Sequence, residues 1–113
     1  MDTGEVRGRL DYTCSEICKL IGVMKRIFKY ELQIADSQKI KTHTCFEPIS
    51  IEMQNQKPVM YAIVDDETPV QKVVLRTYGT GFQLDDCETR DNYIGTYMLI
   101  GGDLVYHVFK HIE

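Results

Sequence analysis

The sequence has no tryptophan, only four phenylalanines and no surplus of basic residues. No apolar run approaches the roughly 20 residues that a membrane-spanning helix needs. The opening residues MDTGE are polar and acidic, unlike a secretory signal peptide. These absences favour a soluble, cytoplasmic protein that does not associate with membranes.

The shortage of positive charge bears on nucleic-acid binding. The chain carries 13 Lys and Arg against 17 Asp and Glu, which gives a net charge of −4. Proteins that hold nucleic acid through its phosphates usually carry a basic surplus or a basic stripe. Because the basic residues are dispersed here, we expect no direct binding of nucleic acid. A mildly acidic surface instead suits a basic surface on a partner protein.

The cysteines form no recognisable metal-binding motif. Cys14 and Cys18 are four residues apart, Cys45 follows His43 by two residues, and Cys87 stands alone in an acidic segment. A zinc site needs three or four such ligands to converge tetrahedrally. The sequence contains no CxxC pair, so we expect reduced thiols, no metal and no cofactor.

Catalytic motifs are also missing. His107 and His111 lie on one predicted strand, and their four-residue spacing separates them by roughly 13 Å along an extended chain. That distance is too long for the two rings to share one substrate atom. No serine lies in a nucleophile-elbow pattern, and no histidines have HxH or HExxH spacing. We therefore expect that the protein is not an enzyme.

What the chain does contain is alternation of apolar and polar residues with a period of two, which is typical of half-buried strands. The alternating segments cover 27–34, 49–54, 59–64, 72–78, 93–99 and 104–111. Glycines between the last two segments, in Gly101-Gly102-Asp103, are the local chemistry of a β-hairpin. Residues 35–46 are polar and have no clear period. We predict a mainly β fold, either a small antiparallel sandwich or a partly closed barrel of five to six strands.

Residues 1–23 differ from the rest of the chain. The spacing of Ile17, Leu20 and Ile21 predicts a short N-terminal amphipathic helix, with Gly22 at its end. The segment that begins at Met24 looks like the start of a protein in its own right. We therefore predict an N-terminal extension over 1–23 and a single β domain over 24–113.

Two acidic loops are the predicted contacts with a protein partner. An inhibitor of an enzyme that handles nucleic acid would use such carboxylates to occupy the basic groove of that enzyme. Neither loop has the alternating ligand order of a calcium site. The residues are Asp65, Asp66, Glu67, Asp85, Asp86 and Glu88.

A glycine loop offers an alternative site for a small ligand such as a nucleotide. Glycines one residue apart permit positive φ and a close backbone approach, as a loop that cradles an anion requires. The remainder of a P-loop is missing, and the same glycines also suit a tight corner after a strand. The candidate ligand-binding residues are Lys72, Arg76, Gly79, Thr80 and Gly81.

An ordered set of short motifs resembles an uncharacterised family of small proteins that is common in bacteriophage and prophage genomes. The motifs are MKRIFKY at 24–30, PVMYAIVD at 58–65, YGTG at 78–81, YIGTY at 93–97 and LVYHVF at 104–109. The resemblance extends over about residues 24–109 and brings no catalytic residues with it. It implies a small β protein encoded by a phage, with glycines and aromatic residues at corners and in the core.

Small proteins of that origin often act by binding, and some inhibit bacterial immune systems such as CRISPR nucleases. Our leading hypothesis is thus a non-enzymatic, phage-derived protein that inhibits or modulates a host protein in the bacterial cytoplasm. A nucleotide-binding sponge and a component of virion assembly are the alternatives. In the last case, sheet edges would pair with neighbouring subunits.

Overall fold

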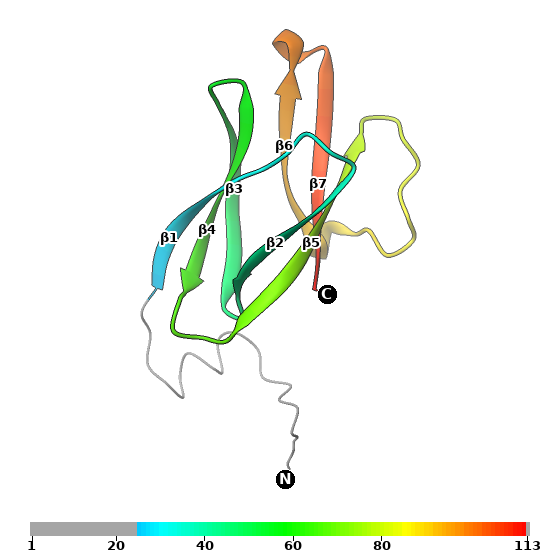
Figure 1. The fold of residues 1–113 in the computed structure, drawn as a ribbon. Coiled ribbons are helices and arrows are strands. Elements are labelled where there is room, and N and C mark those ends of the chain that lie inside the picture. The colour runs from blue at the N-terminus through cyan, green and yellow to red at the C-terminus, as the bar shows by residue number, and fades with distance from the viewer. Residues whose placement is uncertain (1–24, 113) are drawn as a thin grey trace.

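The structure, a computed structural model, describes residues 25–112 and consists of seven antiparallel strands in two sheets (Figure 1). One sheet has three strands in the order β1-β4-β3, and the other has four in the order β2-β5-β7-β6. The strands are β1 (Lys25–Glu31), β2 (Ser37–His43), β3 (Phe46–Gln54), β4 (Lys57–Asp65), β5 (Val70–Gly79), β6 (Tyr93–Leu99) and β7 (Leu104–Ile112). Short 3-10 turns, η1 (Arg90–Asn92) and η2 (Ile100–Gly102), precede and follow β6.

This architecture confirms the mainly β prediction and corrects the number of strands, which is seven rather than five to six. Of the two predicted alternatives, the two separate sheets of the described chain agree with the sandwich and not with the partly closed barrel. The predicted N-terminal helix falls outside the described residues.

The additional strand is β2, in the stretch 35–46 that showed no clear period. Its sequence SQKIKTH contains a single aliphatic side chain, that of Ile40, and Lys39 and Lys41 are exposed on either side of it. β2 forms an edge of the four-stranded sheet, where lysines discourage pairing with further strands. The position of the strand at an edge therefore explains its weak hydrophobic pattern.

The core lies between the two sheets. Its fully buried side chains come mainly from the central strands, because these are covered on both sides by neighbours. They include Met60, Ala62 and Val64 of β4, Val73 and Leu75 of β5, and Val108 of β7. Full burial of a valine, leucine or methionine side chain stabilises the folded state by about 1.5–3 kcal/mol.

Gly95 lets the two sheets approach each other where β3 meets β6. A Cβ at this position would lie 3.1 Å from Cγ1 of Ile51 and 3.4 Å from its Cβ. An alanine here would make the Ile51 side chain give way by a few tenths of an ångström, and larger residues would need more room. The glycine of the YIGTY motif thus suits the close packing of the two sheets.

The loop between β5 and η1 covers the outer face of the four-stranded sheet. Beneath it, Phe109 of β7 is buried and makes edge-on ring contacts with Tyr78 and Tyr93, at centroid distances of 5.7 and 5.6 Å. Alternate residues of β7 point in opposite directions, so His107 and His111 share this outer face with Phe109. The loop therefore lies over a face that carries both aromatic rings and histidines.

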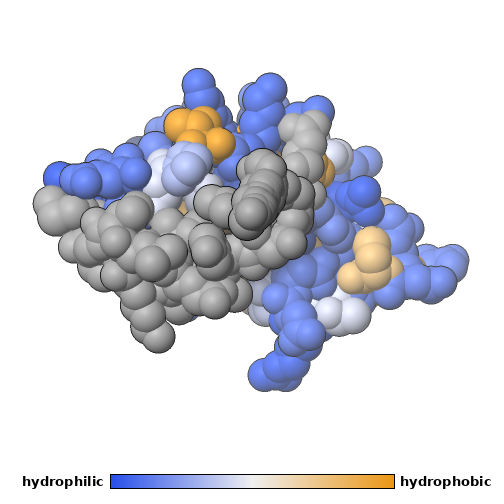
Figure 2. Space-filling view, turned by 90° about the horizontal axis from the view of Figure 1, so that it is seen from below, coloured by the Kyte–Doolittle hydropathy of each residue, from blue (hydrophilic) through white to orange (hydrophobic). Residues whose placement is uncertain are grey.

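Different segments of the chain lie at the two ends of the domain. At one end lie the turns that join β3 to β4 and β6 to β7, beside the end of β5 (Figure 1). Figure 2 views the opposite end, where the coloured surface is mainly hydrophilic with separate apolar patches.

No helix among the described residues has both the length and the apolar character to cross a membrane.

Candidate functional site

The turn between β3 and β4 is a two-residue hairpin connection. Asn55 and Gln56 both have left-handed φ values, of 52° and 66°, and Gln54 pairs with Lys57 across the turn. Two successive left-handed residues are typical of the turn whose twist matches that of the flanking strands. This geometry holds the β3–β4 hairpin in a defined direction at the end of the domain.

The turn between β6 and β7 is also left-handed, but one of its residues is unsuited to that conformation. Ile100 has a φ of 53°, followed by Gly101 and Gly102 with φ values of 62° and 97°. A β-branched residue rarely adopts a left-handed conformation, because its side chain crowds the backbone. The Ile100 side chain is nevertheless 70% exposed, so burial of that side chain does not offset the strain.

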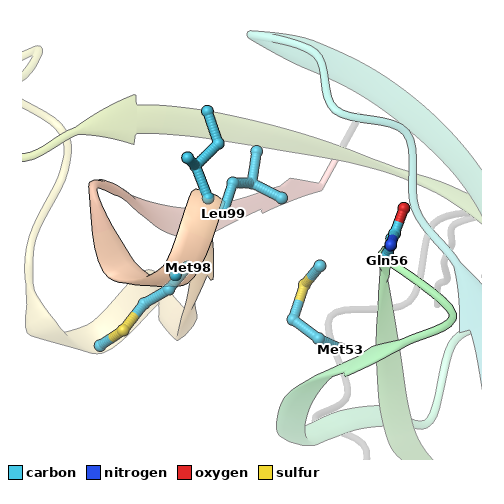
Figure 3. Close-up of a pocket in the computed structure, with 6 residues that line it drawn as sticks. Met53, Gln56, Met98 and Leu99 are labelled. Carbon is cyan, nitrogen blue, oxygen red and sulfur yellow. The ribbon is translucent and has the colours of Figure 1, made fainter.

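Between these two turns lies a cleft of about 590 Å³. In Figure 3, the Met53 side chain points into the space between the β3–β4 hairpin and the end of β6, whereas the Met98 side chain extends away from Met53 at the rim of the cleft. The lining residues are Met53, Gln56, Met98, Leu99, Ile100 and Gly101, and we call this the hairpin cleft. Among these described residues, Gln56 alone has a polar side chain. The cleft is therefore equipped for apolar side chains and lacks the converging polar groups typical of small-molecule sites.

A smaller hollow of about 360 Å³ lies on the other side of the β6–β7 turn and contains part of the predicted glycine site. Here Phe82 N donates to the carbonyl of Gly79 at 3.0 Å, and Thr80 N donates to that of Val105 at 3.1 Å. These two N–H groups are thus already used within the fold. The carboxylate of Asp103 also lines the hollow and would repel an anion. The geometry is that of a tight corner after β5.

The basic residues of the predicted ligand site lie on β5, before the glycine loop that follows this strand. Arg76 donates from Nη1 to Oδ2 of Asp85 at 3.1 Å, and the contact of Arg76 with Tyr78 contributes most to raising the pKa of its guanidinium. Lys72 lies on the same face of β5, four residues before Arg76, and is exposed. The structure therefore does not gather Lys72, Arg76, Gly79, Thr80 and Gly81 around one space.

The six acidic residues predicted to contact a partner fall into two groups, one before β5 and one after it. In the first group, Asp65 is buried and accepts a hydrogen bond from Glu67 N, and Asp66 pairs with Arg26 at 3.4 Å. In the second group, Glu88 is buried. Asp66 is partly exposed, and the exposed residues of the six are Glu67, Asp85 and Asp86, of which Asp85 pairs with Arg76.

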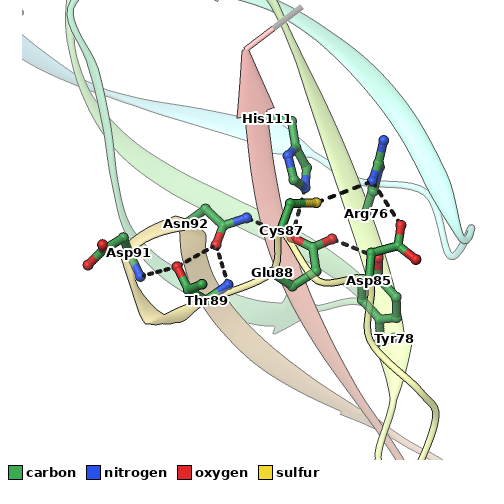
Figure 4. Close-up of polar contacts among 9 residues, drawn as sticks. All are labelled: Arg76, Tyr78, Asp85, Cys87, Glu88, Thr89, Asp91, Asn92 and His111. Carbon is green, nitrogen blue, oxygen red and sulfur yellow. Dashed lines mark hydrogen bonds and ion pairs between the residues drawn. The ribbon is translucent and has the colours of Figure 1, made fainter.

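Glu88 is the centre of a buried polar cluster under the loop (Figure 4). Tyr78 Oη donates to Oε2 of Glu88 at 2.7 Å, and Asn92 Nδ2 donates to Oε1 at 2.6 Å. His111 Nε2 lies 2.8 Å from the same Oε1, but without the alignment of a regular hydrogen bond. The Glu88 side chain has no exposed surface. Two donors and a histidine therefore surround a carboxylate that water does not reach.

The cluster keeps this carboxylate ionised. Burial alone would raise the pKa of Glu88, but the hydrogen bonds from Tyr78 and Asn92 and the contact with His111 outweigh it, so the pKa is lowered. The pKa of Tyr78 is raised, first by burial and then by its hydrogen bond to Glu88. The phenol consequently remains a proton donor to the carboxylate.

Cys87 brings a third kind of ligand to this cluster. Ligand atoms of Cys87, Glu88 and His111 all lie within 4.8 Å of one another, and Arg76 Nη1 is 4.0 Å from the Cys87 sulfur. The sequence did not predict this grouping, because the loop residues and His111 are far apart in the chain. The only signal was the shared face of His107 and His111, but both nitrogens of His107 are occupied by Thr80 and Thr96.

Fold and site together define a two-sheet antiparallel β domain with an apolar cleft at one end and a buried polar cluster on one face. The chain belongs to the family described as Domain of unknown function (DUF7352), which matches residues 24–113. No curated protein matches the chain. No solved structure matches it either.

Proposed function

We propose that the protein is a non-enzymatic binding protein that modulates a protein partner, and that the partner inserts apolar side chains into the hairpin cleft. The observation that carries this proposal is the exposure of large apolar residues around the cleft. Ile100 is 70% exposed, Met98 56% and Met53 36%. Exposed apolar surface of this kind, grouped around a hollow, is typical of protein interaction sites.

The chemistry of the lining favours a protein over a small molecule. Methionine side chains are flexible and polarisable, so they adapt to the shape of an inserted side chain. A small polar ligand would need several polar groups to fix its orientation, and of the described lining residues Gln56 alone offers a polar side chain. An aliphatic or aromatic anchor of a partner protein fits this lining best.

The strained turn supports the same conclusion. A left-handed conformation at a residue other than glycine costs about 1–3 kcal/mol, and such costs are concentrated at binding and active sites. Ile100 accepts this cost while its side chain remains in solvent. A partner that covers Ile100 would remove this apolar side chain from water, and that burial would stabilise the complex.

The resemblance to small phage proteins supports a host protein as the partner, with a CRISPR-type nuclease as the first class to test. The exposed carboxylates of Glu67, Asp85 and Asp86 would then meet basic surface outside the cleft. Charge of this kind mainly accelerates association, whereas apolar anchors determine how long the complex lasts.

The test compares capture of proteins from bacterial lysate by the wild type and by Met53→Glu/Met98→Glu, followed by quantitative mass spectrometry. We expect a partner that the wild type enriches and that this variant enriches at least tenfold less, because two buried charges oppose docking. Ile27→Glu/Val70→Glu is the matched control, since both residues are exposed apolar side chains outside the cleft.

Equal capture of the partner by both double variants and the wild type would exclude the cleft. Loss of capture only after neutralisation of Glu67, Asp85 and Asp86 would identify the acidic loops as the contact instead. Concentration-dependent dimerisation that Met98→Glu abolishes would show that the cleft holds a second copy of the chain.

A further inference from the structure

We propose that Cys87, Glu88 and His111 form a binding site for a zinc-like divalent cation. The three residues supply a thiolate sulfur, a carboxylate oxygen and an imidazole nitrogen, which are the three ligand types that zinc takes from proteins. Their ligand atoms lie within 4.8 Å of one another, and all three residues lie under or in the loop that covers the four-stranded sheet.

The distances between the three ligand atoms need only a small adjustment to suit tetrahedral coordination of zinc. Ligand atoms around zinc lie about 3.5 Å apart when metal–ligand distances are about 2.0–2.3 Å. His111 Nε2 and Glu88 Oε1, at 2.8 Å, would move slightly apart to admit the ion. Cys87 lies on an exposed part of the loop, so its side chain has room to move inward.

His111 supplies an independent indication. Its Nε2 is buried, yet it has no aligned hydrogen-bond partner among the described residues. It lies 2.8 Å from Oε1 of Glu88, outside the geometry of a regular hydrogen bond. A cation between Nε2 and Oε1 would replace this contact with two ligand bonds.

The residues around the carboxylate already hold it as a metal ligand requires. Tyr78 and Asn92 fix the two oxygens of Glu88, and the side chain of Thr89 in turn caps the η1 turn that contains Asn92. Such outer hydrogen bonds orient ligands and typically change metal affinity 10–100-fold. The carboxylate is therefore oriented before any ion arrives.

The local charges also balance. The charges of a divalent ion and of Arg76 would be matched by those of the Cys87 thiolate, Glu88 and Asp85. The Arg76 guanidinium lies beside the Cys87 sulfur, so its positive charge is part of this balance. With three protein ligands, a water molecule would complete the coordination. The ion would tie the loop to β7, independently of the hairpin cleft.

The test titrates tag-free, reduced full-length protein with Zn²⁺ by calorimetry and with Co²⁺ by absorption spectroscopy. The parent for all variants is Cys14→Ser/Cys18→Ser, which removes the two thiols of the N-terminal segment so that they cannot contribute to the signal. We expect this parent to bind one ion and to give the charge-transfer absorption of a cobalt–thiolate bond. Cys87→Ser should abolish that absorption, and both Cys87→Ser and His111→Gln should weaken Zn²⁺ binding at least tenfold.

His107→Gln is the matched control for His111→Gln, because it removes a histidine from the same face of β7. We expect His107→Gln to retain Zn²⁺ affinity within about threefold. Absence of stoichiometric binding to the parent, or binding that Cys87→Ser leaves unchanged, would overturn the proposal. If His111→Gln fails to fold, Cys87→Ser decides the question alone, because Cys87 is exposed and its replacement should not disturb the core.

Discussion

The hairpin cleft and the Glu88 cluster differ in which side chains they bury. The cluster buries a charged side chain, whereas the cleft leaves apolar side chains in solvent. Around Glu88, a buried carboxylate is surrounded by donors, and its surface is fully removed from solvent. Around the cleft, apolar side chains stay in solvent, and one of them lies on a strained turn. The cluster thus stabilises the free protein, whereas the cleft keeps a binding surface available at some cost in stability.

The comparison predicts that substitutions in the two regions have effects of opposite sign. Changes at the cluster should lower the free energy of unfolding and leave capture of the protein partner intact. Changes at the cleft should weaken capture while leaving stability unchanged or higher.

The largest effect is expected for Glu88→Ala. This variant leaves the Tyr78 hydroxyl and the Asn92 amide without their shared acceptor, and breaking a buried charged network costs about 3 kcal/mol. Urea unfolding followed by circular dichroism measures the loss. Asp86→Ala, on the same loop but exposed, should change stability by less than about 0.5 kcal/mol.

Acid should weaken the cluster in metal-free protein. The pKa of Glu88 is lower in the folded state than its ordinary value of 4.5, so its contribution is complete above pH 4.5 and is lost as the pH falls through the folded pKa. Unfolding measured in urea across this range, with a chelator present, should show a steeper acid limb for the wild type than for Glu88→Gln. Parallel acid limbs in the two proteins would contradict the assignment.

Ile100→Asn should have a smaller effect and the opposite sign. Asparagine tolerates a left-handed backbone, so the variant should be more stable by about 1 kcal/mol. The same change removes an anchor from the cleft and should weaken partner capture. Ile27→Asn is the control, because Ile27 is also an exposed isoleucine but is not among the residues with positive φ, and this change should not stabilise the protein.

The smallest effect concerns Tyr97, a buried polar residue without the partners that Glu88 has. Its hydroxyl has no hydrogen-bond partner within the described chain, and burial raises its pKa above 10.0. Tyr97→Phe should change stability by less than about 1 kcal/mol near neutral pH. A raised folded pKa makes stability fall as the pH rises above 10, so thermal unfolding should show a shallower alkaline limb for Tyr97→Phe.

The sequence predicted the parts of this molecule that depend on local pattern. The segments 93–99 and 104–111 alternate clearly, and the structure confirms the hairpin that they form. β2 was missed because an edge strand can carry lysines on both sides of its one aliphatic residue. The number of sheets depends on long-range pairing, such as β1 with β4, which no local pattern encodes.

The sites were less predictable than the strands. Met98 and Leu99 read as strand residues, and only the opposing β3–β4 turn makes them part of a cleft. Similarly, Glu88 looked like one of several solvated acidic residues until the loop folded back over β7 and buried it. Both sites arise from segments that are distant in the chain, so composition and spacing carried little information about them.

The most direct test of the central claim uses the methionines as reporters of partner binding. Met53 and Met98 line the hairpin cleft, whereas Met60 is fully buried in the core and serves as an internal control. The protein is labelled at its methionine ε-methyl groups, and NMR signals are followed as the captured partner is added. We predict that the Met53 and Met98 signals shift or broaden while the Met60 signal stays in place. Saturating partner that leaves Met53 and Met98 unchanged would contradict the account.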